Sequence, residues 1–286
     1  ERRIADKEMG IARMGFLAAQ AALEEAGLGS NEIDAIIVST ATPDRLLPAS
    51  ACDIQALLGA DQAVAFDLWA ACSGWLYALN VAQGLILTGQ IRNALILATE
   101  KMSAIVDWQD RATCVLFGDA AGAAVVVPSE GNGRGILASC MRSDGTLADL
   151  LDRPTMNPEL VLDVAEIGAH GNYVRMAGRE IFKAAVRSMC EAAETTLNDA
   201  GLSIDDVDLL VPHQANIRII EATAKYAGIP MERVWVNVDR YGNTSSASVP
   251  VGLHEARRAG RIKDGSLVLM VAFGAGLTWA ATLLRW

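Results

Sequence analysis

Two stretches of the sequence read AGLGSNEIDAIIVST (26–40) and AGLSIDDVDLLVPHQ (200–214), and they align without a gap. Each holds a helix end, a glycine that stops the helix and an apolar strand, predicted at 34–40 and 207–213. One such match can arise from ordinary helix–turn–strand chemistry. It also suggests an internal duplication, which the flanking sequence can test.

The segments that follow the two copies correspond as well. After the first copy come the strand AVAFDL (63–68), a tight turn with Cys72 and a helix. After the second come the predicted strand VWVNV (234–238), a turn with Asn243 and a helix. This shared order predicts two similar α/β halves whose special turns meet at one site.

Each half is predicted to end in a glycine-punctuated hairpin, at 114–128 and at 267–286. Strands as apolar as these on both faces indicate sheets that helices cover on both sides, which is an α/β fold. The polar stretch 141–177, rich in Gly, Asp and Pro, is predicted to be a connector. The two halves are therefore assigned to 1–140 and 178–286.

The chain has 286 residues, is 52% hydrophobic and carries a formal net charge of −10. It lacks a basic stripe that would neutralise phosphates, so we expect no nucleic-acid partner. An acidic partner would require a local basic patch on this background. No apolar run reaches the roughly 18–20 residues of a membrane span, so no membrane partner is expected.

Five cysteines are an odd number, and their wide spacing contains no C-x-x-C. This pattern fits neither a disulfide framework nor a zinc site, and we predict no metal. Cys52, Cys114 and Cys190 lie in apolar patterns and are expected to be small core residues. A reducing cytoplasm is the simplest location for such a chain.

Cys72 lies at a predicted strand-to-helix junction, in AACSGW. A thiol there faces free backbone N–H groups and the positive end of the helix dipole. An ordinary cysteine is only a few per cent thiolate at neutral pH, and the helix start is expected to raise that fraction. Considered alone, the position fits a buried structural cysteine better than a nucleophile.

His213 ends an apolar strand in VPHQAN, and Asn243 lies in the turn YGNTS. Strand ends are common site positions in α/β folds, although a satisfied core or surface histidine is the commoner case. Asn243 also fits a simple turn residue beside Gly242. The other two histidines, His170 in the connector and His254 on a charged helix, are assigned no role.

In combination, these residues and their contexts resemble one family. The motifs are ERRIA (1–5), FDLWAACSGWLYAL (66–79), DRATCVLFGDAAGAAVV (110–126), VPHQANIRII (211–220), RYGNTSSASVPVGL (240–253) and FGAGLTW (273–279). In this order, over essentially the whole chain, they resemble ketoacyl-acyl-carrier-protein synthase III, the condensing enzymes that start bacterial fatty-acid synthesis. The resemblance implies a thiolase-like fold in which two duplicated halves form a five-layered αβαβα arrangement.

The resemblance also implies an acyltransferase reaction, the decarboxylative Claisen condensation of an acyl-CoA primer such as acetyl-CoA with malonyl-acyl-carrier protein. Cys72 then carries the acyl group as a thioester, while His213 and Asn243 bind the malonyl thioester carbonyl. A neutral imidazole N–H and a carboxamide N–H are two donors suited to a developing enolate oxygen. No cofactor is implied, because acyl-CoA and the carrier protein are substrates.

An oxyanion hole for the other intermediate is implied at the backbone N–H groups of Cys72 and Ala275. Family members usually have three glycines where this chain has Gly274, Ala275 and Gly276. The amide of Ala275 can serve only if the local φ is not positive.

Further contacts follow from the resemblance. Arg111, Asn216 and Arg218 match positions that contact coenzyme A or its pantetheine arm, although solvated surface charge is the alternative for the two arginines. Arg218, Lys225 and Lys183 resemble a basic patch for the acidic carrier protein, which would supply the positive surface that the composition requires.

Leu47 matches a residue that reaches across a homodimer interface to close the partner's acyl tunnel. The family often has Phe there, and a smaller aliphatic group would admit longer or branched primers. About forty residues are expected to precede Glu1 by resemblance. They include a central strand of the first half and a Trp and an Arg that clamp the adenine.

Several alternatives use similar residues. Elongating ketoacyl synthases use two histidines and degradative thiolases a second cysteine, whereas Asn243 takes the third position here and no cysteine follows Cys190. A specialised relative that primes polyketide synthesis, or acylates a small acceptor, keeps the same three residues and stays open. Papain-like hydrolases also use Cys, His and Asn in this order, but their local motif and disulfide context differ, so we disfavour them. A non-catalytic module that binds the carrier protein is disfavoured too, because it would not need a nucleophile.

Overall fold

The computed structural model describes residues 1–153 and 173–286. Most of the expected connector, 154–172 with His170, therefore lies outside the described residues. Within the described part, no helix is long and apolar enough to cross a membrane.

The first sheet has the order β2-β1-β3-β4, with β1, β2 and β3 parallel and β4 antiparallel to β3. Its strands are β1 (Ala35–Ser39), β2 (Val64–Leu68), β3 (Ala94–Lys101) and β4 (Asp119–Val126). One face is covered by α1 (Ile11–Ala26) and α2 (Ser50–Leu58), whose buried side chains pack on β1 and β3.

The second sheet has the order β5-β10-β9-β8, in which β8 and β9 are parallel and β10 is antiparallel to both of its neighbours. Its strands are β5 (Gly135–Ser143), β8 (Leu209–Pro212), β9 (Leu267–Gly274) and β10 (Thr278–Arg285). The outer face is covered by α5 (Gly178–Asp199) and α6 (Ile217–Ala227). A small ribbon pairs β6 (Leu151–Asp152) with β7 (Arg175–Met176).

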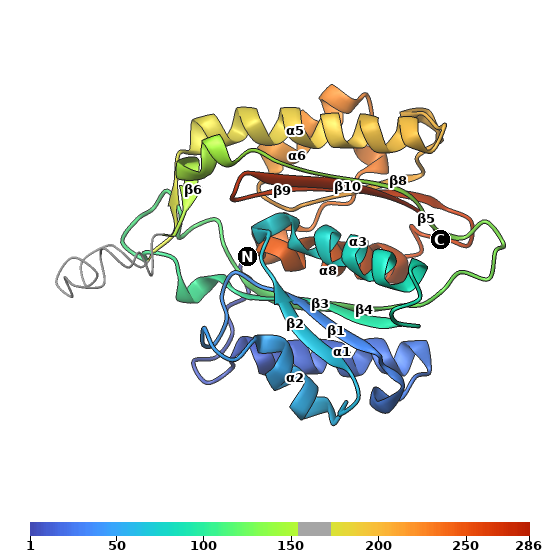
Figure 1. Ribbon diagram of the computed structural model, residues 1–286. Helices are drawn as coiled ribbons and strands as arrows, with labels where there is room; N and C mark the ends of the chain where they lie inside the picture. Colours follow the sequence, from blue (N-terminus) through green and yellow to red (C-terminus); the bar gives the residue numbers. More distant parts are fainter. Residues whose placement is uncertain (154–172) are drawn as a thin grey trace.

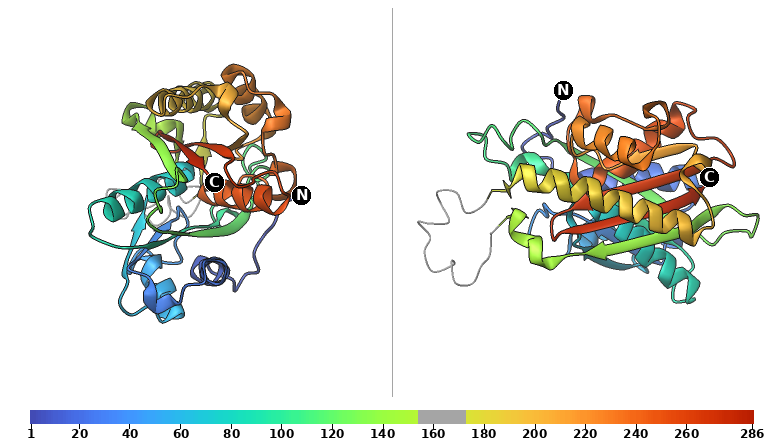
Figure 2. Two further views of the ribbon diagram at one scale, coloured as in Figure 1. Left: turned by 90° about the vertical axis from the view of Figure 1, so that its right-hand side faces the viewer. Right: turned by 90° about the horizontal axis from the view of Figure 1, so that it is seen from above.

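Between the two sheets lie α3 (Gly74–Leu87) and α8 (Ser248–Arg258), as the views in Figures 1 and 2 show. Trp75, Leu76 and Val249 on these helices are almost completely buried, and they share one apolar cluster with strands of both sheets. The order of layers is thus helices, sheet, helices, sheet, helices. This confirms the predicted five-layered αβαβα arrangement.

Short helical segments connect the layers. They are η1 (Ser30–Glu32), η2 (Ala71–Ser73), η3 (Met102–Ala104), η4 (Gly145–Leu150), η5 (Ile204–Asp206), η6 (Met231–Arg233), α7 (Val238–Tyr241) and η7 (Ser245–Ala247). Two of them, η2 and η7, are in contact with each other, η2 also touches β9, and η7 also touches β3. The predicted meeting of the two special turns is therefore confirmed.

Two predicted elements are wrong. The stretch 234–238 forms no strand: Val234 makes a single bridge to Leu210, and the chain turns into α7 at Val238. The stretch 114–128 is no hairpin, because it holds one strand, β4, whose partner is β3. The hairpin at 267–286 is confirmed as β9 and β10.

The chain passes from the first sheet to the second between β4, which ends at Val126, and β5, which begins at Gly135. The expected boundary at residue 140 lies inside this strand, which pairs with β10 of the second sheet. In the first sheet β4 occupies the place that β10 has in the second. Along the outer edge of β4 the described residues provide no counterpart of β5.

Candidate active site

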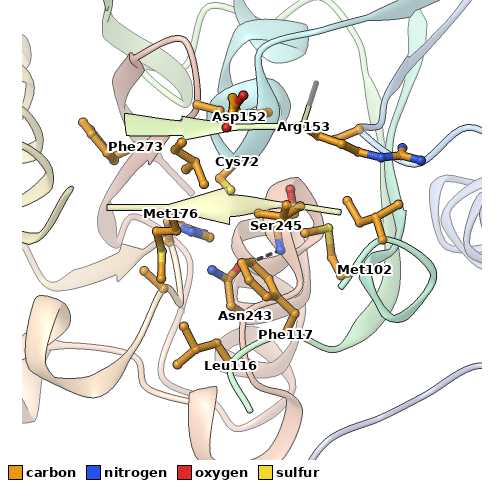
Figure 3. A pocket seen from close by; sticks show the side chains of 18 of the residues that line it. Cys72, Met102, Leu116, Phe117, Asp152, Arg153, Met176, Asn243, Ser245 and Phe273 are labelled. Atoms are coloured by element: carbon orange, nitrogen blue, oxygen red, sulfur yellow. Dashed lines mark hydrogen bonds between the residues drawn. The ribbon is translucent and has the colours of Figure 1, made fainter. Parts of the chain in front are cut away.

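A cavity of about 600 Å³ lies where η2, η7 and the end of β8 converge (Figure 3). Cys72, His213 and Asn243 all line it, so the structure brings together the three residues predicted from the sequence. Much of the remaining wall is apolar and includes Met102, Phe117, Met176, Ile181, Met189 and Phe273. The β6–β7 ribbon adds Asp152 and Met176, and Arg153 follows it.

Cys72 lies in η2, directly before α3, and only 8% of its surface is exposed. Ala71 before it has a φ of 45°, a left-handed conformation that is uncommon for a residue with a Cβ. Burial raises the pKa of the Cys72 thiol to about 12, although a hydrogen bond from Ser245 opposes the shift. The expected rise in thiolate fraction is therefore wrong for the resting site, because desolvation outweighs the helix start.

His213 follows β8 and is 2% exposed. Its Nδ1 lies 2.6 Å from Ser248 Oγ, and the Gln214 N–H donates to the same oxygen at 3.3 Å. We assign the Ser248 hydroxyl as the donor to Nδ1, since its oxygen already accepts from the amide, and this assignment places the ring proton on Nε2. Burial also lowers the pKa of His213 to about 4, so the imidazole is a neutral N–H donor at neutral pH.

Asn243 is held by its backbone and by its side-chain oxygen. Its N–H donates to Leu116 O at 2.8 Å, and its carbonyl accepts from the Gly118 N–H at 3.0 Å. The Oδ1 atom accepts from the Ser245 N–H at 2.9 Å, a bond drawn in Figure 3. With Oδ1 engaged, the amide nitrogen is the end of the side chain left to donate to a ligand.

The turn after β9 packs directly against the cysteine. A Cβ on Gly274 would lie 2.6 Å from the backbone nitrogen of Cys72, so glycine is required there by close approach. Ala275 lines the cavity, and its φ is not positive, which satisfies the condition set from the sequence. The two amides expected to form an oxyanion hole thus belong to backbone segments in contact.

Of the residues expected to contact coenzyme A, only Asn216 lines the cavity. Its Oδ1 caps α6 by accepting from the Ile219 N–H at 3.0 Å. Arg111 and Arg218 are exposed residues that do not line the cavity.

The remaining predicted residues lie on the surface. Lys183 on α5 and Lys225 on α6 are exposed on helices that pack against each other, and Arg218 is also on α6. Leu47 is 85% exposed and does not line this cavity. All five cysteines are free.

Sequence reasoning missed three residues that act on the site. Ser248 sets the histidine tautomer, Ser245 holds Asn243, and Glu100 is a fully buried carboxyl close to Cys72. Glu100 did carry a signal, because it is an acidic residue in an otherwise apolar stretch, ALILATE. The two serines carried none, since NTSSASVP gives no reason to choose one hydroxyl over another.

A cysteine able to hold an acyl group beside two neutral N–H donors is the arrangement that a Claisen condensation requires. The five-layered double α/β fold carries it at the junction of its halves. Fold and site together define a class, the thiolase-like condensing enzymes, which are acyltransferases.

Known proteins narrow this class to one family. The model of the 3-oxoacyl-[acyl-carrier-protein (ACP)] synthase III C terminal matches residues 197–286, and the model of 3-oxoacyl-[ACP] synthase III matches 66–145. The beta-ketoacyl-[ACP] synthase III of Roseiflexus sp. (strain RS-1) is 49% identical over 286 residues, which are 100% of this chain and 87% of the relative. The chain belongs to the 3-oxoacyl-ACP synthase III family.

Solved structures of similar proteins have the same fold as this chain. The crystal structure of 3-oxoacyl-ACP synthase III from Aquifex aeolicus VF5 has a TM-score of 0.91 and 48% identity, covering 100% of this chain and 87% of that one. The priming beta-ketosynthase from the R1128 polyketide biosynthetic pathway has a TM-score of 0.92 and 40% identity, covering 99% and 84%. Because this second structure is named for a polyketide pathway, the alternative of a polyketide-priming enzyme stays open.

Proposed function

We propose that this chain catalyses the decarboxylative Claisen condensation of an acyl-CoA primer with malonyl-ACP. The products are 3-oxoacyl-ACP, CO2 and coenzyme A, and the reaction initiates fatty-acid biosynthesis. The observation that carries this proposal is the convergence of Cys72, His213 and Asn243 on one largely apolar cavity.

In the first half-reaction the Cys72 sulfur attacks the acyl-CoA carbonyl and coenzyme A leaves. The tetrahedral oxyanion would accept hydrogen bonds from the backbone N–H groups of Cys72 and Ala275. This assignment is supported by the close packing of the Gly274 backbone on the Cys72 amide. Each such donor typically contributes about 10²–10³ in rate.

In the second half-reaction the malonyl thioester loses CO2 and its enolate attacks the acyl-cysteine. The enolate oxygen would accept from His213 Nε2 and from the Asn243 amide nitrogen. Both donors are neutral and fixed by other hydrogen bonds, so they need no reorganisation as charge develops. The largely apolar wall keeps these interactions strong by excluding water.

The test uses intact mass. The protein is incubated with acyl-CoAs of different length, then with malonyl-ACP, and each adduct is weighed. We expect an acyl adduct on Cys72 that is discharged as 3-oxoacyl-ACP. Hydrolysis without carbon–carbon bond formation would refute the function, and an adduct on Cys72→Ser would refute the nucleophile.

Two variants test the donor assignment. His213→Ala and Asn243→Ala should acylate at the parent rate and lose decarboxylation by about 10²–10³. Failure of both variants to acylate would show that these residues act in the first half-reaction instead.

The substrates are proposed to bind at the surface around the cavity mouth. Arg111, Asn216 and Arg218 would contact coenzyme A or its pantetheine arm. Lys183, Arg218 and Lys225 would dock the acidic carrier protein; their exposure on the two packed helices α5 and α6 supports this.

A second candidate, priming of polyketide synthesis, is supported by the 40% identity to the R1128 ketosynthase. Condensation assays with carrier proteins from fatty-acid and polyketide pathways would separate the two. A strong preference for the polyketide carrier would favour the second candidate.

We also propose a homodimer that works in the cytoplasm. The outer edge of β2 has no strand partner among the described residues, and Val64 on it is 60% exposed. Leu47, in the segment before α2, is 85% exposed. An apolar strand edge of this kind favours pairing with another chain. Light scattering should give a dimer mass, and Leu47→Asp should lower it; a monomeric parent would refute this proposal. The five free cysteines favour a reducing compartment.

A further inference from the structure

Gln214 lies just past β8 and has no exposed surface. Its side-chain Nε2 donates to the carbonyls of Pro212 at 2.8 Å and Trp235 at 3.1 Å. Its Oε1 accepts from the N–H groups of Asn237 at 2.9 Å and Val238 at 3.1 Å. A carboxamide has two N–H donors and two acceptor lone pairs, so these four bonds fill its capacity.

These bonds lie where a strand ladder is interrupted. β8 is an edge strand of the second sheet. Leu210 on its outer edge forms a parallel bridge to Val234 and accepts from the Trp235 N–H at 2.8 Å. The next position of this ladder would set residue 212 opposite residue 236. Residue 212 is a proline, which has no N–H to donate.

The Gln214 carboxamide replaces the missing peptide group. In a parallel ladder, a residue opposite position 236 donates to the carbonyl of Trp235 and accepts from the N–H of Asn237. Gln214 makes these two bonds with its side chain. It thus extends the joint between β8 and the segment before α7 by two hydrogen bonds beyond the last β-bridge.

One end of this joint carries His213. Pro212, whose carbonyl is bonded to Nε2, directly precedes it. The main-chain N–H of Gln214 donates to Ser248 Oγ, the oxygen that lies 2.6 Å from His213 Nδ1. Gln214 is therefore bonded both to the strand end before the histidine and to the hydroxyl that orients its ring.

The other end leads to Asn243. Asn237 is the N-cap of α7, and Val238 is its first residue. This one-turn helix ends with a bond from the Gly242 N–H to the Val238 carbonyl at 2.9 Å, and Asn243 follows. A single turn thus separates the Gln214 carboxamide from the second enolate donor.

We propose that Gln214 fixes the positions of the two enolate donors, His213 and Asn243, relative to each other. It does not line the cavity, so it touches no substrate and is a positioning residue. This role deepens the proposed function and rests on it for its chemical consequence. Misplacing a catalytic group by about 1 Å can cost about 10²-fold in rate, so the decarboxylation half-reaction should depend on this side chain.

The test uses Gln214→Met, which keeps the length of the side chain and removes its four hydrogen bonds. Decarboxylation of malonyl-ACP, timed on enzyme already acylated, should fall in kcat by about 10²-fold. The KM for malonyl-ACP and the acylation rate of Cys72 should stay at the parent values, because the proposed docking residues and oxyanion amides lie on other segments. A side chain that only stabilised the fold would lower both half-reactions together, in proportion to the unfolded fraction.

Gln55→Met is the matched control. Gln55 on α2 also donates through Nε2 to two main-chain carbonyls, those of Ala60 at 3.2 Å and Ala63 at 2.8 Å, and it does not line the cavity. This variant should leave the ratio of the two half-reaction rates unchanged.

Hydrogen exchange read by NMR tests the link without any substrate. In Gln214→Met the amides of Asn237 and Val238 should exchange faster, by about tenfold, the usual effect of losing one hydrogen bond. The amide of Asn243, which donates to Leu116 O at 2.8 Å, should also exchange faster, because the turn before it is no longer held. Faster exchange confined to Asn237 and Val238 would overturn the proposal.

Gln214→Glu decides the matter if Gln214→Met does not fold. One carboxylate oxygen still accepts from Asn237 and Val238, whereas the other has no proton for the carbonyls of Pro212 and Trp235. Decarboxylation should then fall by about tenfold, with acylation unchanged. Parent decarboxylation in either variant, or an equal loss of both half-reactions, would refute the positioning role.

The positioning role and the proposed function can fail separately. A parent protein that does not decarboxylate malonyl-ACP refutes the proposed function, and the exchange of the Asn243 amide still decides whether Gln214 holds that donor. A parent that condenses while Gln214→Met keeps both half-reactions refutes only the positioning role.

Discussion

Ser248→Ala removes the one hydroxyl that fixes the tautomer of His213. In the parent, Oγ lies 2.6 Å from Nδ1 and accepts from the Gln214 N–H at 3.3 Å. Without that oxygen, Nδ1 has no donor, and the tautomer with the proton on Nδ1 becomes accessible. In that tautomer Nε2 is an acceptor, which would repel an enolate oxygen instead of stabilising it.

The expected loss follows from removing one of two donors. Decarboxylation of malonyl-ACP should slow by about 10²–10³, which is the cost of losing an oxyanion donor. Acylation of Cys72 should stay at the parent rate, because neither expected amide of that oxyanion hole contacts Ser248. Stability should fall by about 1–3 kcal/mol, since the buried Gln214 N–H loses its partner.

The assay separates the two half-reactions. Acyl-enzyme formation is timed by intact mass, and release of CO2 from labelled malonyl-ACP is timed on enzyme already acylated. Ser248→Thr keeps a hydroxyl at the same position and is the matched control, expected to recover most of the decarboxylation. Equal loss of both half-reactions, or parent decarboxylation in Ser248→Ala, would refute the tautomer argument.

Three further predictions concern stability and docking. Gly274→Ala places a Cβ 2.6 Å from the Cys72 nitrogen and should cost about 3 kcal/mol in urea unfolding; a change below about 0.5 kcal/mol would contradict the close approach. The pKa of His213 is lowered from 6.5 to about 4, so its stabilisation is full above pH 6.5 and is lost as the pH falls towards 4. The free energy of unfolding should be about 2–3 kcal/mol lower at pH 4.5 than at pH 7.5 because of this residue. His213→Gln should not show this part of the loss. Exchanging Lys183 and Lys225 for Glu should raise the KM for malonyl-ACP about tenfold and leave acylation unchanged; an unchanged KM would exclude this docking face.

The sequence predicted the layers well because each layer leaves a local pattern. The helix stops at Gly27 and Gly201 and the apolar strands after them are read from adjacent residues, and both are present. The predicted strand at 234–238 failed for the opposite reason. Its residues are strongly β-prone, but only Val234 forms a β-bridge. The N–H groups of Asn237 and Val238 donate to Gln214 Oε1 instead, and α7 begins at Val238.

The three main site residues were predictable because the motifs around them resemble one family. Taken singly, Cys72, His213 and Asn243 each fit a structural role as well. Ser245 and Ser248 act through distances that no spacing rule reports, such as 2.6 Å across 35 residues between His213 and Ser248. Glu100 could have been noticed as the acidic residue of an otherwise apolar stretch. The predicted rise in thiolate fraction failed because a helix start is local, whereas burial depends on the whole fold.

Burial shifts the pKa values of Cys72 and His213 in opposite directions and thereby leaves both groups neutral. A cysteine with its pKa raised to about 12 and a histidine with its pKa lowered to about 4 are both neutral at pH 7. A charged imidazolium would hold a malonyl carboxylate and slow its loss, whereas a neutral donor favours only the charge that develops on the enolate oxygen. Because the His213 imidazole is neutral, it offers Cys72 no positive charge that would stabilise a thiolate. The site therefore differs from one that holds a thiolate–imidazolium pair.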